Sequence, residues 1–206
     1  MKNILGQDGF VYRVLTKTVD LIILNVLFCI SCIPIFTIGT ACTALYSVTL
    51  KMCKNEESYI VRSYARYFKE NLKKATAAWG LCALMVLLFY MDFSILASMK
   101  SEMGFVLTTA VLAAGLFVAM VLSYVFPLMA KFENTLPNIF KNALIISMTR
   151  IFYTIPVTAA NLIFVFVMFA GGMPTVYGVP VYAIIGFALT AYVNSFLLGK
   201  VFERYV

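Results

Sequence analysis

The sequence predicts an all-α, polytopic membrane protein, a bundle of about six membrane segments with amphipathic helices on its cytoplasmic side. Apolar residues make up 63% of the 206 positions and charged residues only 12%, whereas soluble domains carry about 25% charged residues. The apolar residues gather in six runs, and nearly all lysines and arginines lie in alternate gaps between them. We expect one membrane domain over residues 1–206.

The six apolar runs are the candidate membrane segments. A helix rises about 1.5 Å per residue, so about 20 residues cross a hydrocarbon core of about 30 Å. The first run is just long enough and the last four are clear spans, whereas the second has only 14 residues. The runs cover residues 19–36, 40–53, 75–98, 104–129, 151–170 and 180–199.

The distribution of positive charge indicates on which side of the membrane the short second run ends. Three of the Lys and Arg residues precede the first run, seven lie at the end of the second run or follow it, three lie between the fourth and fifth, and two follow the last. All fifteen share one side if the second run returns the chain to its starting side, as the positive-inside rule prefers. We therefore expect both termini to be cytoplasmic. A re-entrant hairpin of the first two runs gives the same sidedness. The fifteen residues are Lys2, Arg13, Lys17, Lys51, Lys54, Arg62, Arg66, Lys69, Lys73, Lys74, Lys131, Lys141, Arg150, Lys200 and Arg204, and Lys100 is the exception.

The link between the first two runs predicts a tight helical turn. Pro34 lacks a backbone donor and ends or bends the first helix, and Gly39 admits backbone angles that other residues avoid. Thr37 or Thr40 can cap the next helix. Two interpretations stay open. The turn is either a packed hairpin without a ligand or a broken element that lines a substrate cavity, as in transporters.

Residues 55–74 predict a basic amphipathic helix on the cytoplasmic side. Asn55 is a plausible N-cap, and four basic residues fall on one stripe opposite apolar side chains. The stripe can contact the anionic inner leaflet at about 1 kcal/mol per residue, or it can dock a cytoplasmic partner. Because membrane topology explains the basic excess, we expect no nucleic acid partner. The stripe consists of Arg62, Arg66, Lys69 and Lys73.

Residues 131–150 predict a second cytoplasmic amphipathic segment. Asn134 or Thr135 can cap a helix that has Pro137 in its first turn. Permeases engage their ATPases through a similar short helix. The pattern of glycine and acidic residues expected in the coupling loop of a sugar permease is absent, so we do not expect a coupling role.

Polar residues inside the runs are the candidates for a polar path. Asn25, Asn161 and Asn194 can bond across helices, and Asp92 lies near the outer end of the third run. Asp20 is expected to pair with Lys17 at the inner interface. Helix rise places Asp92 about 25 Å from the inner end of its run. The two aspartates therefore cannot form a protease dyad.

The remaining chemistry-bearing residues give no sign of an enzyme. The chain has no histidine, which removes the commonest metal ligand and general base. Cys29 and Cys32 match the spacing of a redox dithiol, but they lie inside an apolar run, where a reactive thiolate is not expected. We expect no catalytic residues, no cofactor and no metal site.

Several segments resemble the YesL-like family of bacterial membrane proteins of unknown function. These segments are residues 34–46 (PIFTIGTACTALY), 68–71 (FKEN), 124–132 (YVFPLMAKF) and 138–144 (NIFKNAL). The resemblance implies a location in the bacterial cell membrane. Such proteins are commonly encoded near carbohydrate uptake genes, so it also implies a non-enzymatic accessory or docking component of a carbohydrate transporter complex. The alternative is a small secondary-type transporter with a path near the broken first hairpin. The sequence fixes neither the oligomeric state nor any binding residue.

Overall fold

The computed structural model describes residues 10–56, 59–99 and 101–203, and the charges predicted at Lys2, Lys100 and Arg204 lie outside these ranges. The described residues form helices joined by short links, without a strand. Six stretches are long and apolar enough to cross a membrane. This confirms the predicted all-α bundle and makes the chain a multi-pass membrane protein.

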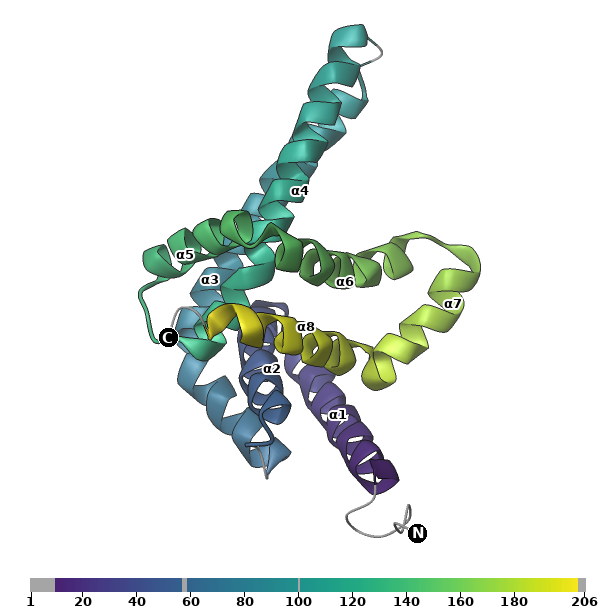
Figure 1. Ribbon diagram of the computed structural model, residues 1–206. Coiled ribbons are helices and arrows are strands. Elements are labelled where there is room, and N and C mark those ends of the chain that lie inside the picture. Colours follow the sequence, from purple (N-terminus) through teal and green to yellow (C-terminus); the bar gives the residue numbers. More distant parts are fainter. Residues whose placement is uncertain (1–9, 57–58, 100, 204–206) are drawn as a thin grey trace.

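The helices follow the predicted runs with some changes of boundary (Figure 1). The last membrane stretch, Gly172–Phe202, is interrupted by a short π-helix, η2. The elements are α1 (Phe10–Cys32), the 3-10 helix η1 (Ile35–Thr37), α2 (Ile38–Cys53), α3 (Ile60–Ala97), α4 (Glu102–Lys131), α5 (Leu136–Thr149), α6 (Ile151–Phe169), α7 (Gly172–Val181), η2 (Tyr182–Gly186) and α8 (Phe187–Phe202).

The short second run forms the centre of the fold. Helix α2 contacts α1, α3, α4 and α8, and it is the most buried of the six membrane stretches. Its small residues allow neighbouring helices to approach closely. The hydroxyls of Thr43, Ser47 and Thr49 donate to carbonyl oxygens one turn earlier, so these polar groups are satisfied inside the bundle. Together η1 and α2 are about 30 Å long.

The turn between α1 and α2 is built differently from the prediction. Pro34 follows the end of α1 in an extended conformation, and Thr37 occupies the N-cap position of α2. The Thr37 hydroxyl makes no capping bond. It lies 2.7 Å from the carbonyl oxygens of both Ser31 and Pro34, so it closes the turn by binding the end of α1.

Gly39 serves close packing and not an unusual backbone angle. It lies inside α2, and a Cβ atom there would come within 2.6 Å of both the Ala75 carbonyl oxygen and the Trp79 Cβ. The neighbouring Thr40 hydroxyl lies 3.1 Å from that of Thr76. Glycine is thus required because α2 and α3 touch here.

Asn55 ends α2 instead of starting the next helix. Its φ of 56° is in the left-handed region, which asparagine tolerates better than most residues at a helix C-terminus. The backbone N–H groups of Asn55 and Glu56 donate to carbonyl oxygens of the last turn of α2. The predicted cytoplasmic helix then begins at Ile60 and continues into the third membrane run as the single helix α3.

Helices α3 and α4 form a long hairpin whose far end projects from the rest of the molecule (Figure 1). The start of α2 meets α3 at Ala75 and Trp79, where the apolar half of α3 begins. The basic half of α3 therefore packs beside α2, and the apolar half extends beyond it. Helix α5 follows α4, with Thr135 at its N-cap position and Pro137 in its first turn.

Candidate functional site

Lysines from separate gaps meet around one cavity of about 590 Å³ at the C-terminal ends of α2, α4 and α8. Lys51 and Lys54 come from the end of α2, Lys131 from α4 and Lys200 from α8. Lys17 of the first gap lies close by on α1, since its Nζ donates to the Tyr192 hydroxyl of α8 at 3.2 Å. Charges from all four basic gaps thus lie near one end of the bundle, which we call the basic end.

Helix ends and acidic residues partly offset the charge of this cavity. The carbonyl groups at a helix C-terminus carry partial negative charge, which lysines in the last turn stabilise. Glu56 and Glu203 also line the cavity. Glu203 lies 4.0 Å from Lys54, and both side chains are exposed, so this ion pair adds little stability. Four lysines against two glutamates leave the lining with a formal excess of positive charge.

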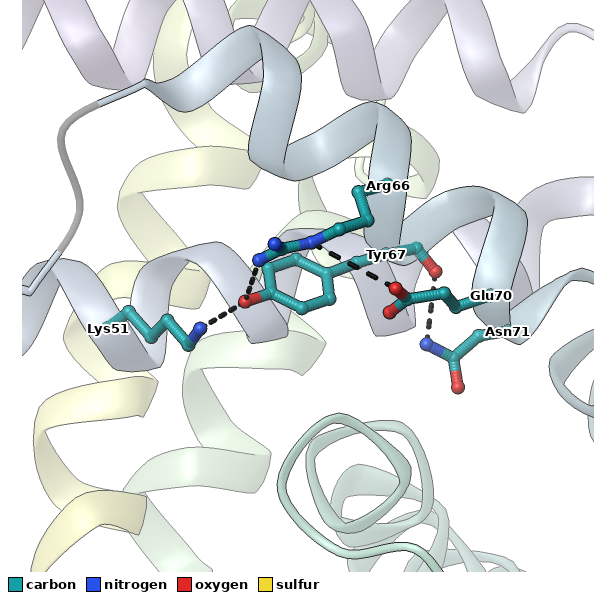
Figure 2. A network of polar contacts seen from close by, with 5 residues as sticks. All are labelled: Lys51, Arg66, Tyr67, Glu70 and Asn71. Atoms are coloured by element: carbon teal, nitrogen blue, oxygen red, sulfur yellow. Dashed lines mark hydrogen bonds and ion pairs between the residues drawn. The ribbon is translucent and has the colours of Figure 1, made fainter.

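A tyrosine joins the basic end to α3 (Figure 2). The Tyr67 hydroxyl accepts hydrogen bonds from Lys51 Nζ and from an Nη atom of Arg66, the latter at 2.9 Å. Both cations also lie 4.9 Å from the centre of the tyrosine ring, a favourable cation–π distance. Glu70 lies 4.0 Å from Arg66 Nε. The bond from Lys51 links the end of α2 to the early turns of α3, whereas the contacts among Arg66, Tyr67 and Glu70 lie within α3.

The four residues of the predicted stripe all point outward. Arg62, Arg66, Lys69 and Lys73 are exposed, whereas Tyr64 on the other side of the helix is buried. The basic half of α3 therefore presents a continuous charged surface next to the basic end.

Two of the predicted polar-path residues meet in a network that is partly buried. Asn194 Nδ2 lies 2.9 Å from Asn161 Oδ1 and 3.3 Å from the Tyr46 hydroxyl. Asn161 Nδ2 in turn donates to the Ser123 hydroxyl at 3.1 Å. The network joins α2, α4, α6 and α8. Sequence reasoning missed Tyr46 and Ser123, although Tyr46 is conspicuous as an aromatic residue in a run of small ones.

Asn25 forms a separate site on α1. Its Nδ2 lies 3.0 Å from the Tyr182 carbonyl oxygen and 2.7 Å from that of Ala183, and its Oδ1 accepts from the Ala188 N–H at 2.9 Å. These backbone groups flank or belong to η2, where the π-helical turn interrupts the regular bonding pattern. The buried Asn25 side chain satisfies them and so holds the π-helix in place.

The two aspartates lie outside both networks. Asp92 is exposed on the projecting part of α3, so the four predicted path residues do not form one cluster. The predicted pair of Asp20 with Lys17 does not form, because Lys17 bonds Tyr192 instead. The five cysteines are free thiols. Among the described residues, no group of three or more Cys, Asp or Glu side chains is placed to hold a metal ion.

A protein-family model matches part of the chain. No curated protein and no solved structure matches it. A family model described as "Protein of unknown function, DUF624" matches residues 21–93, a segment that runs from α1 through most of α3. It includes the turn motif at 34–46 and the FKEN segment at 68–71. Residues 21–93 are thus similar to the DUF624 family, and the predicted resemblance to YesL-like proteins is consistent with this match.

Proposed function

We propose that the protein is a non-enzymatic accessory component of a carbohydrate uptake complex, which it joins through its basic end and the stripe on α3. The gathering of lysines from distant gaps next to an exposed row of cations supports this proposal most strongly. Because positive charge marks the cytoplasmic side of membrane proteins, this surface and both termini face the cytoplasm of a bacterial cell.

The fixed position of the helix that carries the stripe favours docking over a loose electrostatic anchor. The bonds from Lys51 and Arg66 to Tyr67 hold the start of α3 in place, so a partner meets a preformed surface. Preformed surfaces lose less conformational entropy on binding. Acidic segments of a transporter subunit have the complementary charge.

Co-purification from the native membrane in a mild detergent tests the docking role. We expect carbohydrate transporter subunits to be recovered with the wild-type protein and lost with the triple variant R62E/K69E/K73E. Lys141→Glu, which reverses an exposed charge on α5, serves as the control and retains the subunits. Failure to recover any subunit with the wild-type protein contradicts the proposal.

A second candidate, a small transporter, is favoured by the buried network at Asn194. The Oδ1 atom of Asn194 is buried without a hydrogen-bond donor among the described residues, and the membrane stretch to which Asn194 belongs changes to a π-helix at η2. Interrupted helices that expose polar groups are typical of transporter binding sites. The candidate path then lies between α2, α6 and α8, not at the first hairpin. Uptake into reconstituted vesicles that is unchanged by Asn194→Leu excludes this path.

A further inference from the structure

We propose that the cavity at the basic end binds the phosphate group of an amphiphilic phosphoester. The inference concerns a small-molecule site within the basic end, and it does not depend on the partner docking proposed for the basic end and the stripe on α3. The cavity, of about 590 Å³, is within the range of small-molecule sites.

The cations of this cavity are arranged to meet a ligand from several directions. Lys131 and Lys200 are exposed at its edge on two different helices. Neither forms an ion pair with a residue that the structure describes, and Lys200 Nζ lies 4.8 Å from the centre of the Phe196 ring. Because lysine binds phosphate as a point charge with three donors, Lys131 and Lys200 can both contribute to neutralising one phosphate without breaking an ion pair among the described residues.

The walls of the cavity indicate the rest of the ligand. Leu50, Ala130 and Phe196 provide apolar surface beside the lysines. The buried Ser195 also lines the cavity, and its hydroxyl lies 2.7 Å from that of Thr49. A ligand that matches both kinds of surface has a charged group and an apolar part.

The acidic residues limit the charge of the ligand. Glu56 and Glu203 leave a small positive excess that suits a single phosphate group and disfavours a polyphosphate. The headgroup of an anionic phospholipid and a soluble phosphoester share this chemistry. A basic pocket between membrane helices is also a common site for anionic lipid headgroups.

Binding measurements on the purified full-length protein in a nonionic detergent test the site. The lipid probe is dioctanoyl phosphatidylglycerol, with dioctanoyl phosphatidylcholine as the zwitterionic control, and the soluble probe is glycerol 3-phosphate. Native mass spectrometry follows the lipids and calorimetry follows the soluble probe. The variants are K131Q/K200Q in the cavity, K69Q/K73Q as a control that removes the same charge from the stripe, and Glu203→Gln.

The site predicts opposite effects for cavity residues of opposite charge. We expect K131Q/K200Q to weaken binding by on the order of twentyfold, since each lysine near a membrane surface contributes about fivefold. K69Q/K73Q should change the affinity for the probes by less than about twofold. Glu203→Gln should raise the affinity, because it removes the repulsion between the glutamate and the phosphate. Binding of phosphatidylglycerol alone identifies a lipid headgroup as the source, whereas binding of glycerol 3-phosphate identifies the phosphoester itself. The proposal is overturned if neither probe binds, if K69Q/K73Q weakens binding as much as the cavity pair does, or if Glu203→Gln weakens it.

Discussion

Gly39 shows how one missing side chain sets the distance between two helices. The sequence marked this glycine as special, and the prediction assigned it to the turn because Pro34 lies nearby. Its backbone is in fact helical, and the space for a Cβ is already filled by α3. Small residues in a run indicate close helix packing, but the sequence does not say which helix Gly39 meets, so only the three-dimensional structure reveals this role.

Gly39→Val should therefore lower the free energy of unfolding by about 1–3 kcal/mol, as expected for an overpacked core position. Denaturant titration in detergent micelles measures the change. Gly80→Ala is the matched control, because a Cβ at Gly80 meets nothing within 4 Å. A helical Gly→Ala change should be neutral or should stabilise by about 0.5–1 kcal/mol. Equal stabilities for Gly39→Val and the wild-type protein would show that α2 and α3 are not in close contact.

Asn25 is a second residue whose role depends on a distant partner. Asn25→Leu keeps the number and branching of the side-chain heavy atoms but leaves the carbonyl groups of Tyr182 and Ala183 and the Ala188 N–H without their partner. Each unsatisfied buried group costs about 1–3 kcal/mol, so we expect a clear loss of thermal stability. Asn138→Ala, at an exposed position on α5, should have little effect. An unchanged melting temperature for Asn25→Leu argues against a role of the Asn25 side chain in stabilising η2.

At the scale of elements, α3 combines two predicted segments in one helix. The basic stripe and the apolar run were both recognised from the sequence, because the helical spacing of the charges and the length of the run are local signals. Their continuity was missed, although residues 60–79 contain no proline or glycine that would end a helix. Without a breaker, the amphipathic part has no reason to stop at Lys74 and lie flat on the membrane.

The network at Tyr67 explains how the start of α3 is held. Tyr67→Phe removes the acceptor for Lys51 and Arg66 but keeps the aromatic ring. We expect a loss of about 1 kcal/mol of local stability, seen as faster amide hydrogen exchange in the first turns of α3. Tyr59→Phe removes a hydroxyl from an exposed tyrosine just before the helix and should leave exchange unchanged. Identical exchange in both variants would mean that the hydroxyl does not stabilise the helix start.

At the scale of the whole molecule, the helix inventory was predictable and the relative placement of the helices was not. Apolar run lengths and charge gaps depend on the sequence alone, so the number and type of the membrane stretches follow from it. The position of α2 along α3, beside its basic half, depends on the contact of Gly39 with its neighbours in space. The meeting of Asn161 with Asn194 likewise depends on how α6 crosses α8.

We propose that the basic gaps share one side of the membrane and that this side is the cytoplasm. Single cysteines in a variant without native cysteines, labelled with a membrane-impermeant maleimide, test it most directly. The positions are Lys69, Lys141 and Glu203 near the basic gaps and Met99 at the tip of the α3–α4 hairpin, all exposed. We predict that only M99C is labelled in intact cells and that K69C, K141C and E203C are labelled after permeabilisation. Labelling of any of these three in intact cells to the extent seen for M99C would contradict the account.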